Sequence, residues 1–208
     1  MELNQDIKGQ KLEEIFKFLN SISDRMSIER YCAERIPEEE FEKVQKEYKE
    51  HILKLDRERR QEYATNENNI RKTLKKHLEI KDDKEANKYF DKLLEQDLDV
   101  LNEVKNDGEK RIINPIEEDV IAKKYTRVAT TTRGPIMQQY YIKIGELLKR
   151  IEQDMTSLFA FPYHINNEEY ENLTFYKDEK MIFSICSHEN YAMLHEDLKK
   201  EILNIINT

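Results

Sequence analysis

The chain has 208 residues, 38% of them charged and 38% hydrophobic, with only four Gly, four Pro and a formal net charge of -8. This length is sufficient for one ordinary domain or two small ones. The negative charge argues against binding of nucleic acid by the whole surface. The low glycine and proline content favours long helices over a loop-rich enzyme.

The N-terminal segment and the two cysteines bear on where in the cell the protein is located. Cys32 and Cys186 are far apart and match neither a zinc-binding spacing nor a secreted disulfide framework. The first sixteen residues, MELNQDIKGQKLEEIF, contain no apolar signal core, and no segment approaches the ~20 apolar residues of a membrane span. We therefore expect a cytoplasmic protein that is not inserted in a membrane, and nothing in the sequence calls for a cofactor.

The first elements along the chain are predicted to be helices. Apolar residues at spacings of three and four predict a helix over residues 3–19. A short second helix would carry Met26, Tyr31 and Cys32. Pro37 and the three glutamates after it predict the start of a long third helix, because proline and acidic side chains both favour the first helical turn.

The next segment is interpreted as an antiparallel helical hairpin. Its first arm covers residues 37–78, with a break in the run Thr65–Asn69 as an even alternative. Its second arm covers residues 84–107, and Gly108 is expected to terminate it. The apolar stripes of the two arms would pack on each other, or on a second copy, in the manner of a coiled coil. Residues 1–110 are therefore assigned to a helical region.

Residues 111–208 are assigned to a smaller α+β region. Asn114-Pro115 and Gly134-Pro135 each predict the start of a helix, and the second of these helices has the strongest amphipathic pattern in the chain. Beyond residue 158, short aromatic and β-branched runs predict an antiparallel meander of three or four strands, closed by a C-terminal helix. The predicted fold is therefore mainly α, with a small α+β C-terminal part.

Residues 121–150 are the most unusual segment, with seven Lys or Arg and a single acidic residue. Interleaved tyrosines and hydroxyls suggest phosphate contacts and base stacking. The candidate residues are Lys123, Lys124, Tyr125, Arg127, Thr131, Thr132, Arg133 and Tyr140. The alternative is a basic strip that pairs with acidic neighbours in its own chain, which is the commoner situation.

Two other groups of residues are candidates for chemistry. On a regular strand Cys186 and His188 would point to the same face, as a thiolate and imidazole pair requires, although Cys186 also fits a core position. His188 and His195, with His164 as a third ligand, are the candidates for a metal site, but their spacing matches no compact ligand pattern.

These observations favour a non-catalytic protein–protein interaction module, a regulator or adaptor of bacterial or phage type that acts through helical surfaces. Its partner would be another protein or a second copy of the chain in a homo-oligomer. The alternative is a protein that binds nucleic acid or nucleotide phosphates through residues 121–150. An enzyme is the less favoured class, and its candidate form is a hydrolase that uses Cys186 and His188.

Overall fold

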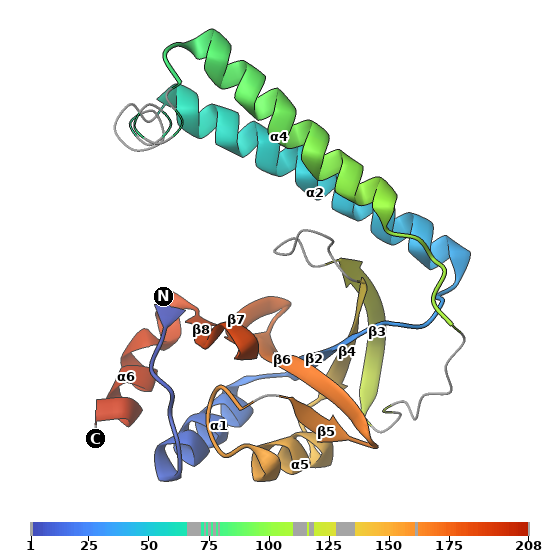
Figure 1. Ribbon diagram of the computed structural model, residues 1–208. Helices are drawn as coiled ribbons and strands as arrows, with labels where there is room; N and C mark the ends of the chain where they lie inside the picture. Colours follow the sequence, from blue (N-terminus) through green and yellow to red (C-terminus); the bar gives the residue numbers. More distant parts are fainter. Residues whose placement is uncertain are drawn as a thin grey trace. The chain divides into compact units, whose positions relative to one another are not determined.

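The computed structural model describes residues 2–65, 72, 74, 76, 78, 80–109, 116, 119–127, 136–160 and 162–207. The chain folds into two compact units that alternate along the sequence, and their elements can be followed in Figure 1. The sheet unit comprises residues 1–32, 111–124 and 137–208, and the hairpin unit comprises residues 33–110 and 125–136. Each unit is described below by itself.

The sheet unit is built on an eight-stranded sheet with antiparallel strand pairs. In spatial order the strands are β1 (Glu2–Leu3), β8 (Tyr191–Leu194), β7 (Lys180–Cys186), β6 (Glu168–Lys177), β2 (Arg25–Tyr31), β4 (Ile136–Lys143) and β3 (Val120–Arg127), while β5 (Tyr163–Ile165) pairs with β6 off this path. The central strand β2 therefore lies between β6 and β4, both of which come more than a hundred residues later in the sequence.

Three helices share the main core with the strands and lie on one side of the sheet in Figure 1. They are α1 (Gln10–Ile22), α5 (Glu146–Asp154) and α6 (Lys199–Asn207). Apolar side chains that alternate along the strands supply the other half of this core, among them the fully buried Met26, Ile28, Tyr140, Ile142, Phe175 and Phe183. Because strand side chains alternate between faces, the intervening residues form a second, largely polar face.

The mainly α fold predicted from the sequence is wrong. The predicted small meander is part of an eight-stranded antiparallel sheet, to which β2, β3 and β4 also belong. Descriptions of the whole chain as α-helical or as a coiled coil are wrong for the same reason. The segments predicted as a second helix, and as helices over about 115–128 and 135–155, contain these three strands.

The period of the apolar pattern explains this error. Ile136 and Tyr140 are four residues apart, a spacing that an amphipathic helix and a strand both satisfy. In the structure Ile136, Gln138, Tyr140 and Ile142 are all buried, which is the two-residue period of a strand. Only the C-terminal part of the predicted helix, α5, is helical.

The hairpin unit contains the long helices α2 (Glu38–Thr65) and α4 (Asp83–Glu103), which pack against each other. Glu38, Glu39 and Glu40 occupy the first turn of α2, where the positive end of the helix dipole stabilises them. The Asp82 side chain caps α4 by accepting a hydrogen bond of 2.9 Å from the Glu85 N–H.

Apolar clusters and ion pairs together hold α2 against α4. One cluster contains Tyr63, Ala86 and Phe90, and the other contains Tyr48, Ile52 and Leu101. Between them the Arg60 Nε lies 2.9 Å from Asp56, its Nη2 lies 2.9 Å from Asp91, and its guanidinium lies over the Phe90 ring. The fork geometry of arginine makes these contacts directional, so they define how the two helices are aligned.

None of the helices in the described part of the chain is both long enough and apolar enough to cross a lipid bilayer.

Candidate functional site

The structure describes five of the eight residues proposed for phosphate or nucleic acid binding. Thr131, Thr132 and Arg133 lie outside the described residues. Lys123 and Lys124 are exposed on β3, and Tyr125 is partly buried there. Tyr140 is fully buried in the core, where its hydroxyl donates a hydrogen bond to the Gln138 Oε1. A base therefore cannot stack on Tyr140 unless the core opens.

Arg127 ends β3 in the hairpin unit and is held against α2. Its guanidinium lies 4.1 Å from the centre of the Tyr48 ring, and its Nη1 donates a hydrogen bond of 2.7 Å to the Gln45 Oε1. Only 9% of the residue is exposed. Burial lowers the pKa of Arg127, while the nearby Tyr48 acts in the opposite direction. These contacts fix the orientation of the guanidinium.

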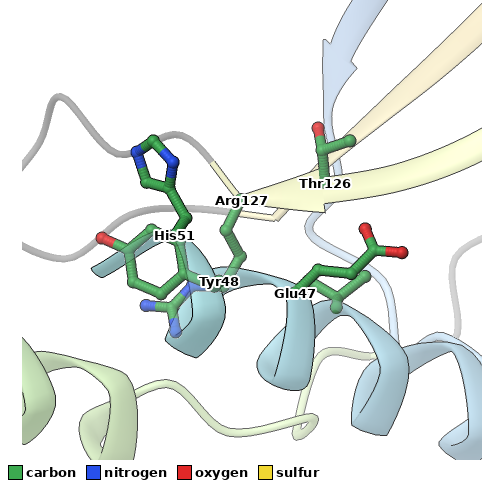
Figure 2. Close-up of a pocket in the computed structure, with 6 residues that line it drawn as sticks. Glu47, Tyr48, His51, Thr126 and Arg127 are labelled. Atoms are coloured by element: carbon green, nitrogen blue, oxygen red, sulfur yellow. The ribbon is translucent and has the colours of Figure 1, made fainter. Parts of the chain in front are cut away.

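A pocket of about 260 Å³ lies beside this arginine and is shown in Figure 2. Its lining residues are Val44, Glu47, Tyr48, His51, Thr126 and Arg127. The four residues from α2, Val44, Glu47, Tyr48 and His51, are at positions i, i+3, i+4 and i+7, so they share one face of the helix. In Figure 2 the Arg127 guanidinium lies against the Tyr48 side of the pocket, and the Glu47 carboxylate is turned to the other side.

The sequence interpretation included Arg127 but missed its neighbours. Neither Tyr48 nor His51 was among the candidate residues. A tyrosine and an arginine are the side chains that most often contribute strongly to protein–protein binding. The volume of the pocket lies below the ~300 to 1,000 Å³ typical of sites for drug-sized ligands. It is therefore better matched to a single side chain.

His188 does not lie on the strand that ends at Cys186. The His188 Nδ1 lies 2.8 Å from the Glu171 Oε2, and His188 belongs to a short 3-10 helix after β7 rather than to the strand. Burial raises the pKa of the Cys186 thiol, and the charge of Glu189 acts in the same direction, whereas a hydrogen bond with Tyr191 lowers it. The thiol is thus less ready to ionise than an ordinary cysteine.

The histidines proposed as metal ligands have other partners. The His195 Nδ1 lies 3.1 Å from Asp197, next to the start of a short 3-10 helix, and the His164 Nε2 lies 3.8 Å from Glu169. Among the described residues, no three His, Cys, Asp or Glu side chains form a group that could hold a metal ion.

The polar face of the sheet carries a connected group that the sequence interpretation did not find. Glu29 on β2 accepts hydrogen bonds of 3.1 Å from Gln139 and of 3.1 Å from Asn172. Gln139 in turn accepts a hydrogen bond from Tyr141, while Ser27 lies 3.2 Å from the Tyr176 hydroxyl. Strand alternation brings these residues to one face, but their pairing depends on strand neighbours that are remote in the sequence.

A groove of about 540 Å³ runs between α1 and α5 in the sheet unit. Leu12, Phe16 and Met155 form its apolar part, and Lys17 and Lys149 lie among its charged residues. Glu152 also lines the groove, and burial raises its pKa although a hydrogen bond from Asn20 lowers it. The groove offers apolar contact, but its charges of both signs select no particular ligand.

One flank of α4 presents apolar side chains that the hairpin only partly covers. Tyr89, Leu93 and Val100 are all half-buried and lie at helical spacings of four and seven residues. Tyr89 and Leu93 pack against the cluster of Tyr63, Leu74, Ile80, Ala86 and Phe90, yet part of each of the two side chains remains accessible. We call Tyr89, Leu93 and Val100 the α4 flank.

Comparisons with protein-family models, with curated proteins and with solved structures found no match to this chain.

Proposed function

We propose that this protein is a non-catalytic protein-interaction module whose hairpin binds an amphipathic helix of a protein partner. The observation that supports this proposal is the α4 flank, where Tyr89, Leu93 and Val100 remain half-buried at helical spacing. Burial of apolar area stabilises an association by about 25 cal/mol per Å² before the costs of binding are subtracted. A third helix laid along α4 would bury this flank.

A helix is the partner element that suits such a surface. Residues repeated at three and four positions on α4 form ridges into which the side chains of another helix can pack. Recognition of an amphipathic helix by a hydrophobic surface of this kind is a recurrent mode of peptide binding. The hairpin would then form a three-helix arrangement with its partner.

Charge supports a protein partner over nucleic acid. The helix α4 contains seven acidic residues and only three lysines, and α2 contains nine acidic and seven basic residues. The phosphates of a nucleic acid would be repelled along much of the hairpin. In addition, Tyr140, one of the residues proposed to stack on bases, is buried.

Site-specific photocrosslinking in cells of the native host tests this function. A photoreactive phenylalanine analogue at position 93 or 100 is expected to crosslink to a helical segment of one protein, whereas the same analogue at the exposed positions 96 and 102 is not. The double variant Leu93→Glu, Val100→Glu should abolish the crosslink formed from position 89. The matched variant Gln96→Glu, Asn102→Glu adds the same charge and should retain it.

Two outcomes would contradict the proposal. One is a crosslink of equal yield from all four positions, which would indicate random encounter. The other is a dimeric mass in light scattering that the Leu93→Glu, Val100→Glu variant reduces to a monomer, because the flank would then be covered by a second copy of the chain. Circular dichroism of both variants checks that α2 and α4 still form.

A further inference from the structure

We infer that the pocket beside Arg127 receives one acidic side chain of a protein partner, with its carboxylate against the Arg127 guanidinium. This inference rests on the proposed function, since it assumes that the ligand is a protein. It adds to that function a second contact point, formed by α2 and the end of β3 within the hairpin unit.

Residues with hydrogen-bond donors line the pocket from two elements. Arg127 and Thr126 come from the end of β3, and His51 comes from α2. A guanidinium, a hydroxyl and an imidazole all donate hydrogen bonds, and a carboxylate accepts them through two oxygens. Arginine in particular matches a carboxylate in geometry as well as in charge. The side chain that complements Arg127 is therefore aspartate or glutamate.

Neighbouring side chains hold the Arg127 guanidinium in place without any partner. The Tyr48 ring supports one side of its guanidinium at 4.1 Å, and the neutral amide of Gln45 accepts a hydrogen bond of 2.7 Å. Because the Arg127 side chain is already ordered, binding of a carboxylate to it costs little side-chain conformational entropy. Burial also lowers the pKa of Arg127, and the negative charge of a carboxylate beside the guanidinium would favour its charged form again.

The lining of the pocket also limits what can enter. A volume of about 260 Å³ holds a side chain, whereas a nucleotide would need the larger space of a typical ligand site. Glu47 places a negative charge on the far side of the pocket from Arg127. It disfavours a multiply charged phosphate more than a single carboxylate that is held at Arg127.

Small model compounds test the inference without knowledge of the partner. The full chain, labelled with ¹⁵N and ¹³C, is titrated with N-acetylglutamate N-methylamide, with the neutral N-acetylglutamine N-methylamide and with inorganic phosphate. The glutamate compound is expected to shift the resonances of Arg127 Nε–H and of the Thr126 methyl group saturably. It should bind about tenfold more tightly than the glutamine compound, because its hydrogen bonds are charge-assisted.

Substitutions at position 127 test whether the Arg127 guanidinium is the group that binds the glutamate compound. Arg127→Gln should abolish the saturable shift, and Arg127→Lys, which keeps the charge but loses the fork, should weaken binding several-fold. Lys49→Gln removes an exposed positive charge beside Tyr48 and serves as the matched control, in which binding should be unchanged. If Arg127→Gln perturbs the fold, as judged by circular dichroism, the comparison of Arg127→Lys with Lys49→Gln decides the question.

Each alternative result overturns the inference. Absence of a saturable shift, or equal affinity for the glutamate and glutamine compounds, excludes a carboxylate site. Tighter binding of phosphate assigns the pocket to phosphate-bearing ligands instead. The crosslinking experiment on the α4 flank uses other residues and another readout, so failure of the proposed function is distinguished from failure of this inference.

Discussion

Glu29 on β2 and Glu171 on β6 are directly opposite each other in the antiparallel pairing of these strands. Like charges in this position destabilise a sheet. Burial raises the pKa of Glu29, and the charge of Glu171 raises it further, whereas the hydrogen bond from Asn172 lowers it. The Glu171 Oε2 also lies 2.8 Å from the His188 Nδ1. This arrangement makes the stability of the sheet unit dependent on pH.

We expect Glu29→Gln to stabilise the protein at neutral pH. The folded state binds the Glu29 proton more tightly than the unfolded state, so stability falls as the pH rises from the unfolded pKa through the folded one. Glutamine does not titrate, so it removes both this loss of stability and the repulsion between the two carboxylates. We expect the variant to be more stable by about 0.5–1 kcal/mol at pH 7.5. The Asn172 Oδ1, which has no hydrogen-bond partner, can accept from the new amide after the Asn172 amide turns over.

Urea unfolding at pH 4 and at pH 7.5 checks this prediction. The advantage of Glu29→Gln should be smaller at pH 4, where the wild-type carboxyl is protonated to a greater extent in both states. Glu42→Gln, on the exposed surface of α2, is the control and should change stability little at either pH. A gain from Glu29→Gln that is equal at both pH values would contradict the account.

Asn172 occupies a backbone conformation that favours glycine. Its φ is 56°, and it lies where the register between β2 and β6 shifts by one residue, which marks a bulge. Asn172→Gly and Asn172→Ala both remove the hydrogen bond to Glu29, so their difference isolates the backbone. We expect the glycine variant to be more stable than the alanine variant by about 1 kcal/mol in thermal unfolding. Equal stabilities would show that the bulge relaxes at no cost.

Gly108 is expected to tolerate no side chain. The sequence interpretation made it the residue that ends the second hairpin arm, but α4 ends at Glu103. Instead, a Cβ at position 108 would lie 2.7 Å from the Glu34 carbonyl carbon and 2.8 Å from the Arg35 nitrogen. Because both atoms belong to the backbone, Gly108→Ala should cost about 1–3 kcal/mol of overpacking. Hydrogen exchange of residues 33–36 measures this cost, and exchange unchanged by the substitution would contradict the prediction.

The Cys186 thiol should react slowly with alkylating agents. Because burial raises its pKa, the fraction of thiolate at pH 7.5 is lower than in an unhindered cysteine. Iodoacetamide labelling followed by peptide mass spectrometry should find Cys186 several-fold slower in the folded protein than in urea. Labelling faster than that of free cysteine would instead support the hydrolase hypothesis with Cys186 as nucleophile.

Some features of the fold could be predicted from short stretches of sequence. Pro37 with its three glutamates marks the start of α2, and Asp82 caps α4, because capping depends on atoms only a few residues apart. The aromatic runs beyond residue 158 indicated β6 and β7 for a similar reason, since polar turns separate them. Local signals of this kind do not depend on what the element later packs against.

The sheet and the candidate site could not be predicted in this way. For β4 a spacing of four residues fits both helix and strand, and only pairing with β2, more than a hundred residues earlier, selects the strand. Likewise, Arg127 contacts Gln45 and Tyr48 of α2, from which it is separated in the sequence by the whole of α4. The sequence by itself determined where the two long helices start and the charge of the basic segment. The tertiary structure decided the strand order, the Glu29–Glu171 opposition and the burial of Arg127, because each depends on contacts between residues that are remote along the chain.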